Sequence, residues 1–159
     1  TQQMELKESY INEGLVMMSI HIDNYDEVYS QTESEKRPIV FAEIDRLITS
    51  YIHNYKGFVK KYESDRYNVV LQKKDLEEII KDKFKIVDKV RDVSLVNKMP
   101  PTLSIGVGIN EPTVRATEKS ANAALDIALG RGGDQVVIRD GMRWNTMAEK
   151  TRQQRRGPR

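Results

Sequence analysis

The sequence predicts an α+β fold in which helices cover a mostly antiparallel sheet, and three observations lead to this prediction. Strand-like and helix-like segments alternate in the order β-α-β-β-α-β-α-β. Two short neighbouring strands are joined by a polar link of hairpin length. The chain has 159 residues, of which 38% are hydrophobic, which is enough to bury one core and indicates a single domain.

The first strand and the first helix are predicted from their apolar patterns. Residues 15–22 are almost continuously apolar, as expected of a central strand that is covered on both faces. Apolar side chains at helical spacing then predict an amphipathic helix over 34–54. Thr32 and Glu35 match the capping box that precedes many helices, and Gly57 lies just past the end, where a helix stop belongs.

A hairpin and a second helical segment follow. Residues 58–62 and 67–71 have the composition of two short strands, and the polar residues 63–66 link them. Apolar side chains then recur every three or four positions over 75–95. This spacing predicts helical structure that is broken near Asp82.

The last third of the chain contains a strand, a helix and a closing strand. Residues 102–109 form the predicted strand, in which two glycines leave room for a close backbone approach. A helix starts at Pro112 and ends at the glycine-rich segment 130–133. Because that segment follows a helix, we interpret it as a helix C-cap and tight turn rather than a phosphate-binding loop. Residues 135–139 close the sheet.

The formal net charge of +2 is unevenly distributed. From Arg139 onward seven lysine and arginine residues accompany two acidic residues, so residues 1–138 carry a net charge of about −3. A nucleic-acid-binding face is a clustered basic surface, and the body of the chain offers none, so nucleic acid is not expected as a partner. The absence of cysteine excludes disulfides and thiolate metal sites.

Three parts are expected along the chain. Residues 1–12 are interpreted as a lead-in from an upstream domain, and residues 13–140 as the folded domain. Residues 141–159 are basic and poor in apolar side chains, and we expect them to form a flexible tail or linker.

Two polar clusters are candidates for a functional site. The first, residues 23–27, directly follows the first strand, and the second is the hairpin link 63–66. If the two strands are neighbours, their carboxylates converge, and carboxylate oxygens are what Mg²⁺ prefers while it holds nucleotide phosphates. In the alternative interpretation, Asp23 and Asp26 cap the next helix and the hairpin is simply solvated. His21, beside the first cluster, is either a core histidine or a neighbour of a metal.

Four ordered motifs resemble those of GGDEF domains. Segments 22–27, 61–67 and 103–108 follow the GGDEF layout. Residues 124–136 are similar to the signature of the degenerate GGDEF domain in membrane-anchored, DHH-type cyclic-di-AMP phosphodiesterases of the GdpP type. The resemblance covers about residues 13–140 and implies a nucleotide-cyclase-like sandwich.

The resemblance places the functional hairpin motif at Glu63–Tyr67 rather than at Gly132-Gly133-Asp134. Active diguanylate cyclases carry Gly-Gly-Asp/Glu-Glu-Phe at this hairpin. Here Glu63 and Ser64 replace the two glycines and would crowd the substrate, while Asp65 keeps the carboxylate that binds metal in the family. Arg66 reverses the charge of the next position.

Four further family positions are substituted. The first metal-binding aspartate falls on His21, the guanine-reading asparagine on Tyr29, and two phosphate-binding lysines on Asp26 and Leu129. A carboxylate in place of a lysine repels a triphosphate. The resemblance therefore implies that the domain lacks diguanylate cyclase activity.

The resemblance also implies a larger parent protein. In that family, two transmembrane helices and a PAS domain precede the GGDEF domain, and a DHH/DHHA1 unit that hydrolyses cyclic-di-AMP follows it. We therefore expect this chain to be a cytoplasmic domain of a protein that is anchored in the bacterial cell membrane by segments outside it. Its expected partners are the PAS and DHH/DHHA1 domains, with a homodimer as a further option.

The resemblance also implies that the domain binds ATP and hydrolyses it weakly. Asp65 would be the catalytic carboxylate and, with Asp23 and the backbone carbonyl of Ile22, would hold Mg²⁺ or Mn²⁺ together with the nucleotide. The residues expected to contact nucleotide are Asp23, Asn24, Lys61, Glu63, Ser64 and Arg66, of which Lys61 and Arg66 could meet phosphate. One alternative is a non-catalytic scaffold that dimerises or transmits signals. The other is an active cyclase with a variant motif.

Overall fold

The computed structural model describes residues 14–93, 99–141 and 143–146, and these form eleven helices and strands. In chain order they are β1 (Leu15–Ile22), α2 (Tyr25–Gln31), α3 (Arg37–Asn54), β2 (Phe58–Glu63), β3 (Arg66–Gln72), α4 (Lys73–Lys81), α5 (Ile86–Arg91), β4 (Leu103–Ile109), α6 (Val114–Gly130), β5 (Val136–Asp140) and β6 (Arg143–Thr146).

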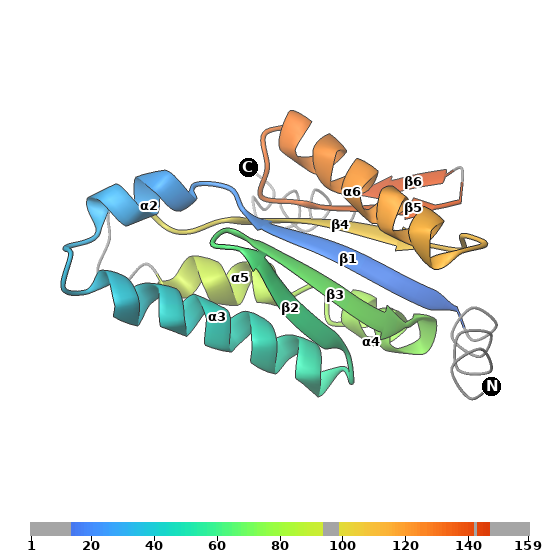
Figure 1. Cartoon of the computed structure of the whole chain (residues 1–159), viewed down its shortest axis with the longest axis horizontal. Coiled ribbons are helices and arrows are strands. Elements are labelled where there is room, and N and C mark those ends of the chain that lie inside the picture. Colours follow the sequence, from blue (N-terminus) through green and yellow to red (C-terminus); the bar gives the residue numbers. More distant parts are fainter. Residues whose placement is uncertain (1–13, 94–98, 142, 147–159) are drawn as a thin grey trace, which may run out of the picture.

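Within these residues the strands form one sheet of six, in the order β2-β3-β1-β4-β5-β6. Every neighbouring pair is antiparallel except β4 and β5, which are parallel. Helices cover both faces, with α3, α4 and α5 on one side and α6 on the other (Figure 1). The predicted α+β sandwich with a mostly antiparallel sheet is confirmed.

The predicted elements are all present, and their ends shift by a few residues. The predicted break near Asp82 is confirmed, because α4 ends at Lys81 and α5 begins at Ile86. The predicted capping box was wrong. Thr32 is the C-cap of α2, a helix that was not predicted from the sequence, and its hydroxyl donates to the carbonyl of Val28 at 2.5 Å.

One strand lies in a segment that the sequence analysis assigned to the tail. Residues 143–146 form β6, which pairs with β5 so that Trp144 is opposite Arg139. The guanidinium carbon of Arg139 lies 5.0 Å from the centre of the indole ring. The sheet therefore continues to Thr146. The expected lead-in at 1–12 and the rest of the expected tail, 147–159, lie outside the described residues.

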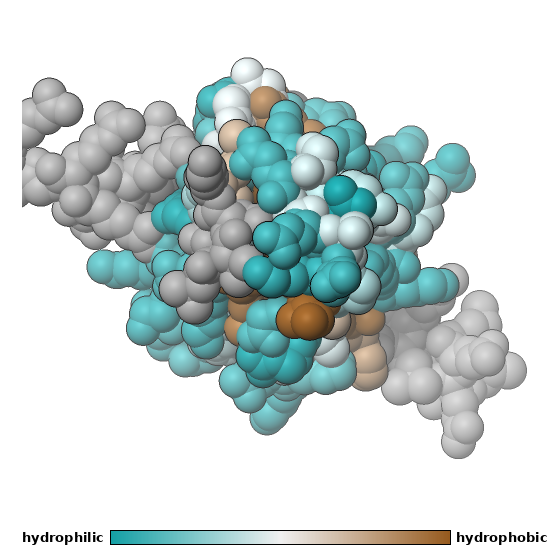
Figure 2. Space-filling model, turned by 90° about the vertical axis from the view of Figure 1, so that its left-hand side faces the viewer, coloured by the Kyte–Doolittle hydropathy of each residue, from teal (hydrophilic) through white to brown (hydrophobic). Residues whose placement is uncertain are grey.

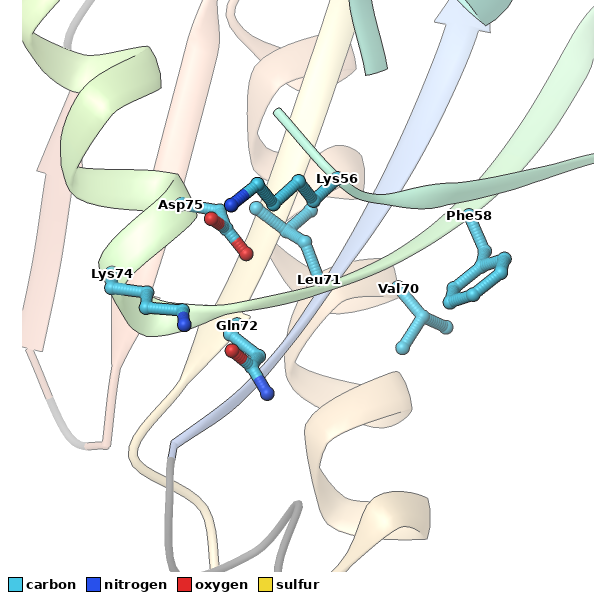
Figure 3. A pocket seen from close by; sticks show the side chains of 7 residues that line it. All are labelled: Lys56, Phe58, Val70, Leu71, Gln72, Lys74 and Asp75. Carbon is cyan, nitrogen blue, oxygen red and sulfur yellow. The ribbon is translucent and has the colours of Figure 1, made fainter. Parts of the chain in front are cut away.

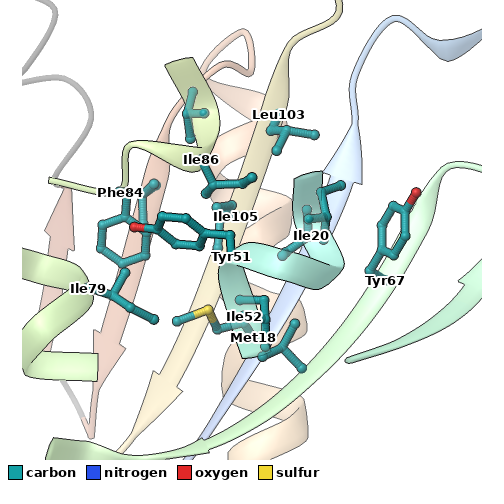
Figure 4. Close-up of a cluster of buried hydrophobic side chains, with 14 of the residues drawn as sticks. Met18, Ile20, Tyr51, Ile52, Tyr67, Ile79, Phe84, Ile86, Leu103 and Ile105 are labelled. Atoms are coloured by element: carbon teal, nitrogen blue, oxygen red, sulfur yellow. The ribbon is translucent and has the colours of Figure 1, made fainter. Parts of the chain in front are cut away.

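The two faces of the sheet are packed differently. The main core fills the face under α3, α4 and α5, where Ile20, Ile52 and Ile105 are buried among other large apolar side chains (Figure 4). On the opposite face α6 lies almost directly on the backbone of β4. A Cβ atom added to Gly106 would lie 2.2 Å from the carbonyl oxygen of Ala121. The close approach predicted for the glycines of this strand is therefore confirmed.

We expect Gly106→Ala to lower the free energy of unfolding by about 3 kcal/mol, because the added methyl group meets helix backbone that has no room to relax. Gly130→Ala at the end of α6 is the matched control, since its Cβ would meet nothing within 4 Å. That control should be neutral or stabilise by up to about 1 kcal/mol. Urea unfolding of both variants measures the difference, and equal effects would contradict the packing described.

Candidate functional site

The end of β1 and the hairpin between β2 and β3 lie side by side, so the two polar clusters meet as expected. His21 is opposite Arg66 on β3 and opposite Ser104 on β4. The backbone N–H of Ile22 donates to the carbonyl of Asp65 at 2.9 Å. The candidate site is therefore built on the central strand of the sheet and on its two neighbours.

The imidazole of His21 lies between two carboxylates. Its Nε2 atom is 3.2 Å from Oδ2 of Asp65, and its Nδ1 atom is 3.5 Å from Oδ1 of Asp23. Only 17% of the His21 side chain and 14% of the Asp23 side chain are exposed. The contact with Asp23, although long for a hydrogen bond, is the largest cause that raises the pKa of His21, and the charges of both carboxylates act in the same direction. Burial of the ring and the charge of Arg66 oppose that rise.

The carboxylate of Asp23 is fastened to two other segments. Its Oδ2 atom accepts hydrogen bonds from the backbone N–H of Asp134 at 2.9 Å and from the hydroxyl of Thr102 at 3.0 Å. Gly133 packs against it, and a Cβ atom there would lie 2.9 Å from Cγ of Asp23. Gly133 also has a φ of +77°, which L side chains rarely adopt. The glycine-rich turn after α6 therefore holds a carboxylate of this chain.

Asn24 makes structural contacts to the segment that precedes β4. Its side-chain N–H donates to the carbonyl of Pro100 at 2.8 Å, and its Oδ1 atom accepts from the N–H of Thr102 at 3.1 Å. The N–H group and the oxygen of the Asn24 amide are thus both hydrogen-bonded to backbone. The contact of Asn24 with nucleotide stays a prediction.

Asp134 extends the polar contacts to α5. Its backbone N–H also donates to the hydroxyl of Ser104 at 3.0 Å. Its carboxylate accepts from the guanidinium of Arg91 at 2.5 Å, and Arg91 contacts Asp88 at 3.4 Å. We call the series Asp65–His21–Asp23–Asp134–Arg91 the polar relay. It joins the hairpin to α5, which packs against α3 and β4.

The hairpin residues expected to contact nucleotide differ in exposure. Glu63, Ser64 and Lys61 are exposed, whereas Asp65 and Arg66 are half-buried. The ammonium group of Lys61 lies 3.2 Å from Asp45 of α3, so its charge is already balanced.

Asp45 also accepts a hydrogen bond from the hydroxyl of Tyr67, the last residue of the hairpin motif. Burial and this carboxylate together raise the pKa of Tyr67.

The substituted family positions lie on α2 and α6. Asp26 is exposed in the first turn of α2, and Leu129 lies half-buried near the end of α6. Tyr29 keeps 44% of its surface exposed although its ring stacks near Tyr25, with centroids 6.2 Å apart. The guanidinium of Arg37 lies 4.2 Å above the Tyr29 ring.

The residues expected to bind metal are brought together, but their arrangement does not fit a metal ion. Asp23 uses one oxygen for the Asp134 and Thr102 contacts, and its other oxygen faces the His21 ring. Among the described residues, no group of three or more histidine, aspartate or glutamate side chains is placed to hold a metal ion together. The metal assignment to Asp65, Asp23 and the Ile22 carbonyl stays a prediction.

Several residues around this site were not predicted from the sequence, namely Thr102, Ser104, Asp134 and Arg91. The hydrogen bonds of Asp23 reach residues that are 79 and 111 positions away in the chain. No local pattern marks such partners, because each of these residue types is also common in turns and at the ends of helices. Only the glycine pair at 132 and 133 gave a local signal, which indicated a tight turn.

Two surface hollows lie apart from the polar relay. One, of about 150 Å³, lies at the end of the hairpin away from its turn and is lined by Phe58, Val70 and Asp75 among others (Figure 3). The other, of about 430 Å³, lies between α3 and α5 and includes Ile39 and Val93. The end of the molecule at α2 and the start of α3 is mainly hydrophilic, with a small apolar area (Figure 2).

Comparison with known proteins identifies relatives of this chain. Residues 20–145 match the family model described as "Cyclic-di-AMP phosphodiesterase GdpP-like, GGDEF domain". The chain is 34% identical over 139 residues to the cyclic-di-AMP phosphodiesterase GdpP of Bacillus subtilis, and 36% identical over 141 residues to that of Geobacillus thermodenitrificans. These alignments cover 87% and 89% of the chain but 21% of each relative, so the chain spans about a fifth of their length.

Solved structures share the fold at low sequence identity. The GGDEF domain of DgcB from Caulobacter crescentus has a TM-score of 0.70 and 14% identity, covering 86% of this chain and 82% of that one. The active GGEEF domain of a diguanylate cyclase from Vibrio cholerae has a TM-score of 0.69 and 19% identity, covering 84% and 88%. The expected nucleotide-cyclase-like architecture is thereby confirmed. In the part of the chain that the structure describes, every helix is too short or too polar to cross a membrane.

We expect Asp23→Asn to lower the free energy of unfolding by about 1–3 kcal/mol, because it weakens charge-assisted hydrogen bonds to Asp134 and Thr102 and the contact with His21. Asp126→Asn on the exposed face of α6 is the matched control and should change it by less than about 0.5 kcal/mol. Chemical unfolding at neutral pH measures both. Equal stability of the two variants would show that the carboxylate of Asp23 does not fasten the turn.

Proposed function

The chain belongs to the family of GGDEF domains of GdpP-like cyclic-di-AMP phosphodiesterases. We propose that it regulates such a phosphodiesterase, binds ATP with weak ATPase activity, and lacks diguanylate cyclase activity. The PAS and DHH/DHHA1 partners, the anchor in the cell membrane and the cytoplasmic position belong to the same proposal. They rest on the family, because the chain spans only about a fifth of its relatives.

The loss of cyclase chemistry is supported above all by His21. Joining two nucleotides requires metal ions that polarise phosphate oxygens and activate the attacking hydroxyl. An imidazole with one carboxylate on each side stands where the family places a metal-binding aspartate. The exposed carboxylate of Asp26 would in addition repel a triphosphate. In this sense the domain is a degenerate GGDEF domain.

ATP binding is supported by the groups that remain at this end of the sheet. Arg66 is half-buried beside His21, and its guanidinium suits a phosphate. Tyr29 stands where the family reads guanine, and its partly exposed aromatic side chain suits contact with any base, because stacking does not depend on a hydrogen-bond pattern. A nucleotide brings its own Mg²⁺ or Mn²⁺, for which Asp65 offers a half-buried carboxylate in the hairpin, whereas Glu63 is exposed. Without a full set of protein ligands, any hydrolysis would be weak.

A scaffold that transmits signals without binding nucleotide is the second candidate. The polar relay favours it, because side-chain contacts and the backbone N–H of Asp134 connect the hairpin to α5 through His21 and Asp23. A chain of packed polar contacts can couple two surfaces of a domain, and this holds with or without a ligand. Nucleotide binding therefore distinguishes the two candidates.

ATP should raise the melting temperature of the chain by several degrees, since at about ten times its Kd a ligand stabilises the native state by about 1.4 kcal/mol. Arg66→Ala should reduce the shift, and Arg115→Ala, exposed in the first turn of α6, should retain it. Thermal unfolding with and without millimolar ATP and Mg²⁺ measures this. An unchanged melting temperature on addition of ATP and Mg²⁺ would favour the scaffold.

Incubation with GTP and Mn²⁺ should yield no cyclic-di-GMP above the level of a protein-free control, as measured by mass spectrometry. The reason is the side-chain arrangement around His21, which leaves Asp23 and Asp65 facing an imidazole. Turnover that disappears in Asp65→Asn would overturn this part of the proposal and identify a cyclase with a variant motif.

A further inference from the structure

Both ring nitrogens of His21 face carboxylate oxygens of different residues. Nε2 contacts Asp65 at 3.2 Å, and Nδ1 faces Oδ1 of Asp23 at 3.5 Å. Nδ1 and Asp23 Oδ1 are both buried, and neither makes a hydrogen bond within the described residues. Buried polar atoms are nearly always paired, so two unpaired atoms that face each other need a physical explanation. The two atoms are therefore each other's main interaction.

The geometry of the ring keeps the two carboxylates apart. Nδ1 and Nε2 of an imidazole point in diverging directions, so oxygens that face them lie on different sides of the ring. A Mg²⁺ ion needs its oxygen ligands at about 2.0–2.1 Å from one centre. Asp23 and Asp65 cannot both reach one ion at that distance while His21 lies between them.

Asp23 and Asp65 bring two carboxylates to the same strand end, one at each nitrogen of the His21 ring. Arg66 lies nearby on β3, opposite His21, but the structure places the imidazole between the two acids. His21 therefore contacts both carboxylates at the position where a bridging ion would do so.

We propose that the side chain of His21 takes the place of a divalent cation between Asp23 and Asp65, and fastens the hairpin to the end of β1 without any metal. The chain itself then holds the hairpin turn against the end of β1. Because Asp23 also binds the turn at Gly133 and Asp134, the same contact fixes the start of the polar relay. This inference concerns the protein without nucleotide and stands whether or not ATP binds.

The test replaces His21 by aspartate and uses Mn²⁺ alone as the probe. His21→Asp gathers three carboxylates, so it should lower the melting temperature in metal-free buffer and recover stability when Mn²⁺ is added. Calorimetric titration should show that it binds Mn²⁺ about tenfold or more tighter than the wild type. His53→Asp on the exposed face of α3 is the matched control and should show neither recovery with Mn²⁺ nor tighter Mn²⁺ binding, although an aspartate in the last turn of the helix can itself lower the melting temperature slightly.

Two results would overturn the proposal. The first is a folded His21→Asp protein that gains no more Mn²⁺ binding than His53→Asp. The second is stoichiometric binding of Mn²⁺ to the wild type that Asp65→Asn abolishes. The second measurement needs only the wild type and Asp65→Asn, so it decides the question even if His21→Asp does not fold. Neither measurement contains nucleotide, so failure of ATP binding is a separate result.

Discussion

The carboxylate of Asp23, which is largely buried at the end of the central strand, constrains most of its surroundings. A buried carboxylate without partners costs several kcal/mol, so each of its oxygens needs a donor or a positive neighbour. One oxygen receives the Asp134 N–H and the Thr102 hydroxyl, and the other faces His21. The first requirement fixes the turn after α6 and makes glycine necessary at 133, where a Cβ atom would collide with the carboxylate. The second ties His21, and through it Asp65 and the hairpin, to the same point.

The fold was largely predictable from the sequence because its signals are local. An unbroken apolar run predicted β1, and helical spacing predicted α3 to α6. Gly106 predicted a close approach to the strand, and the backbone of α6 makes that approach. Two elements were not predicted: α2 is only seven residues long, and β6 pairs with β5 in a segment whose charge suggested a tail. Thr32 was wrongly predicted as a helix N-cap because its hydroxyl donates a hydrogen bond to the carbonyl of Val28. That bond forms only because α2 precedes Thr32.

The candidate site was predictable in place but not in arrangement. Strand adjacency was enough to bring residues 23–27 and 63–66 together. The pairing of individual atoms depends on partners up to 111 positions apart in the chain, such as Asp23 and Asp134. It also depends on the face of the sheet toward which each side chain points. Lys61 illustrates the limit. As a hairpin lysine it suggested a phosphate ligand, yet it lies against Asp45 of α3, a contact that only the packing of that helix on the sheet creates.

If the His21 side chain, and not a metal ion, joins the hairpin to the end of β1, Mn²⁺ should not bridge the two carboxylates. Anomalous diffraction at the manganese edge locates the ion in crystals of the wild-type chain grown with Mn²⁺. We expect no anomalous peak within bonding distance of both Asp23 and Asp65, with the His21 ring lying between them. A peak that bridges the two carboxylates, with His21 turned away, would contradict it.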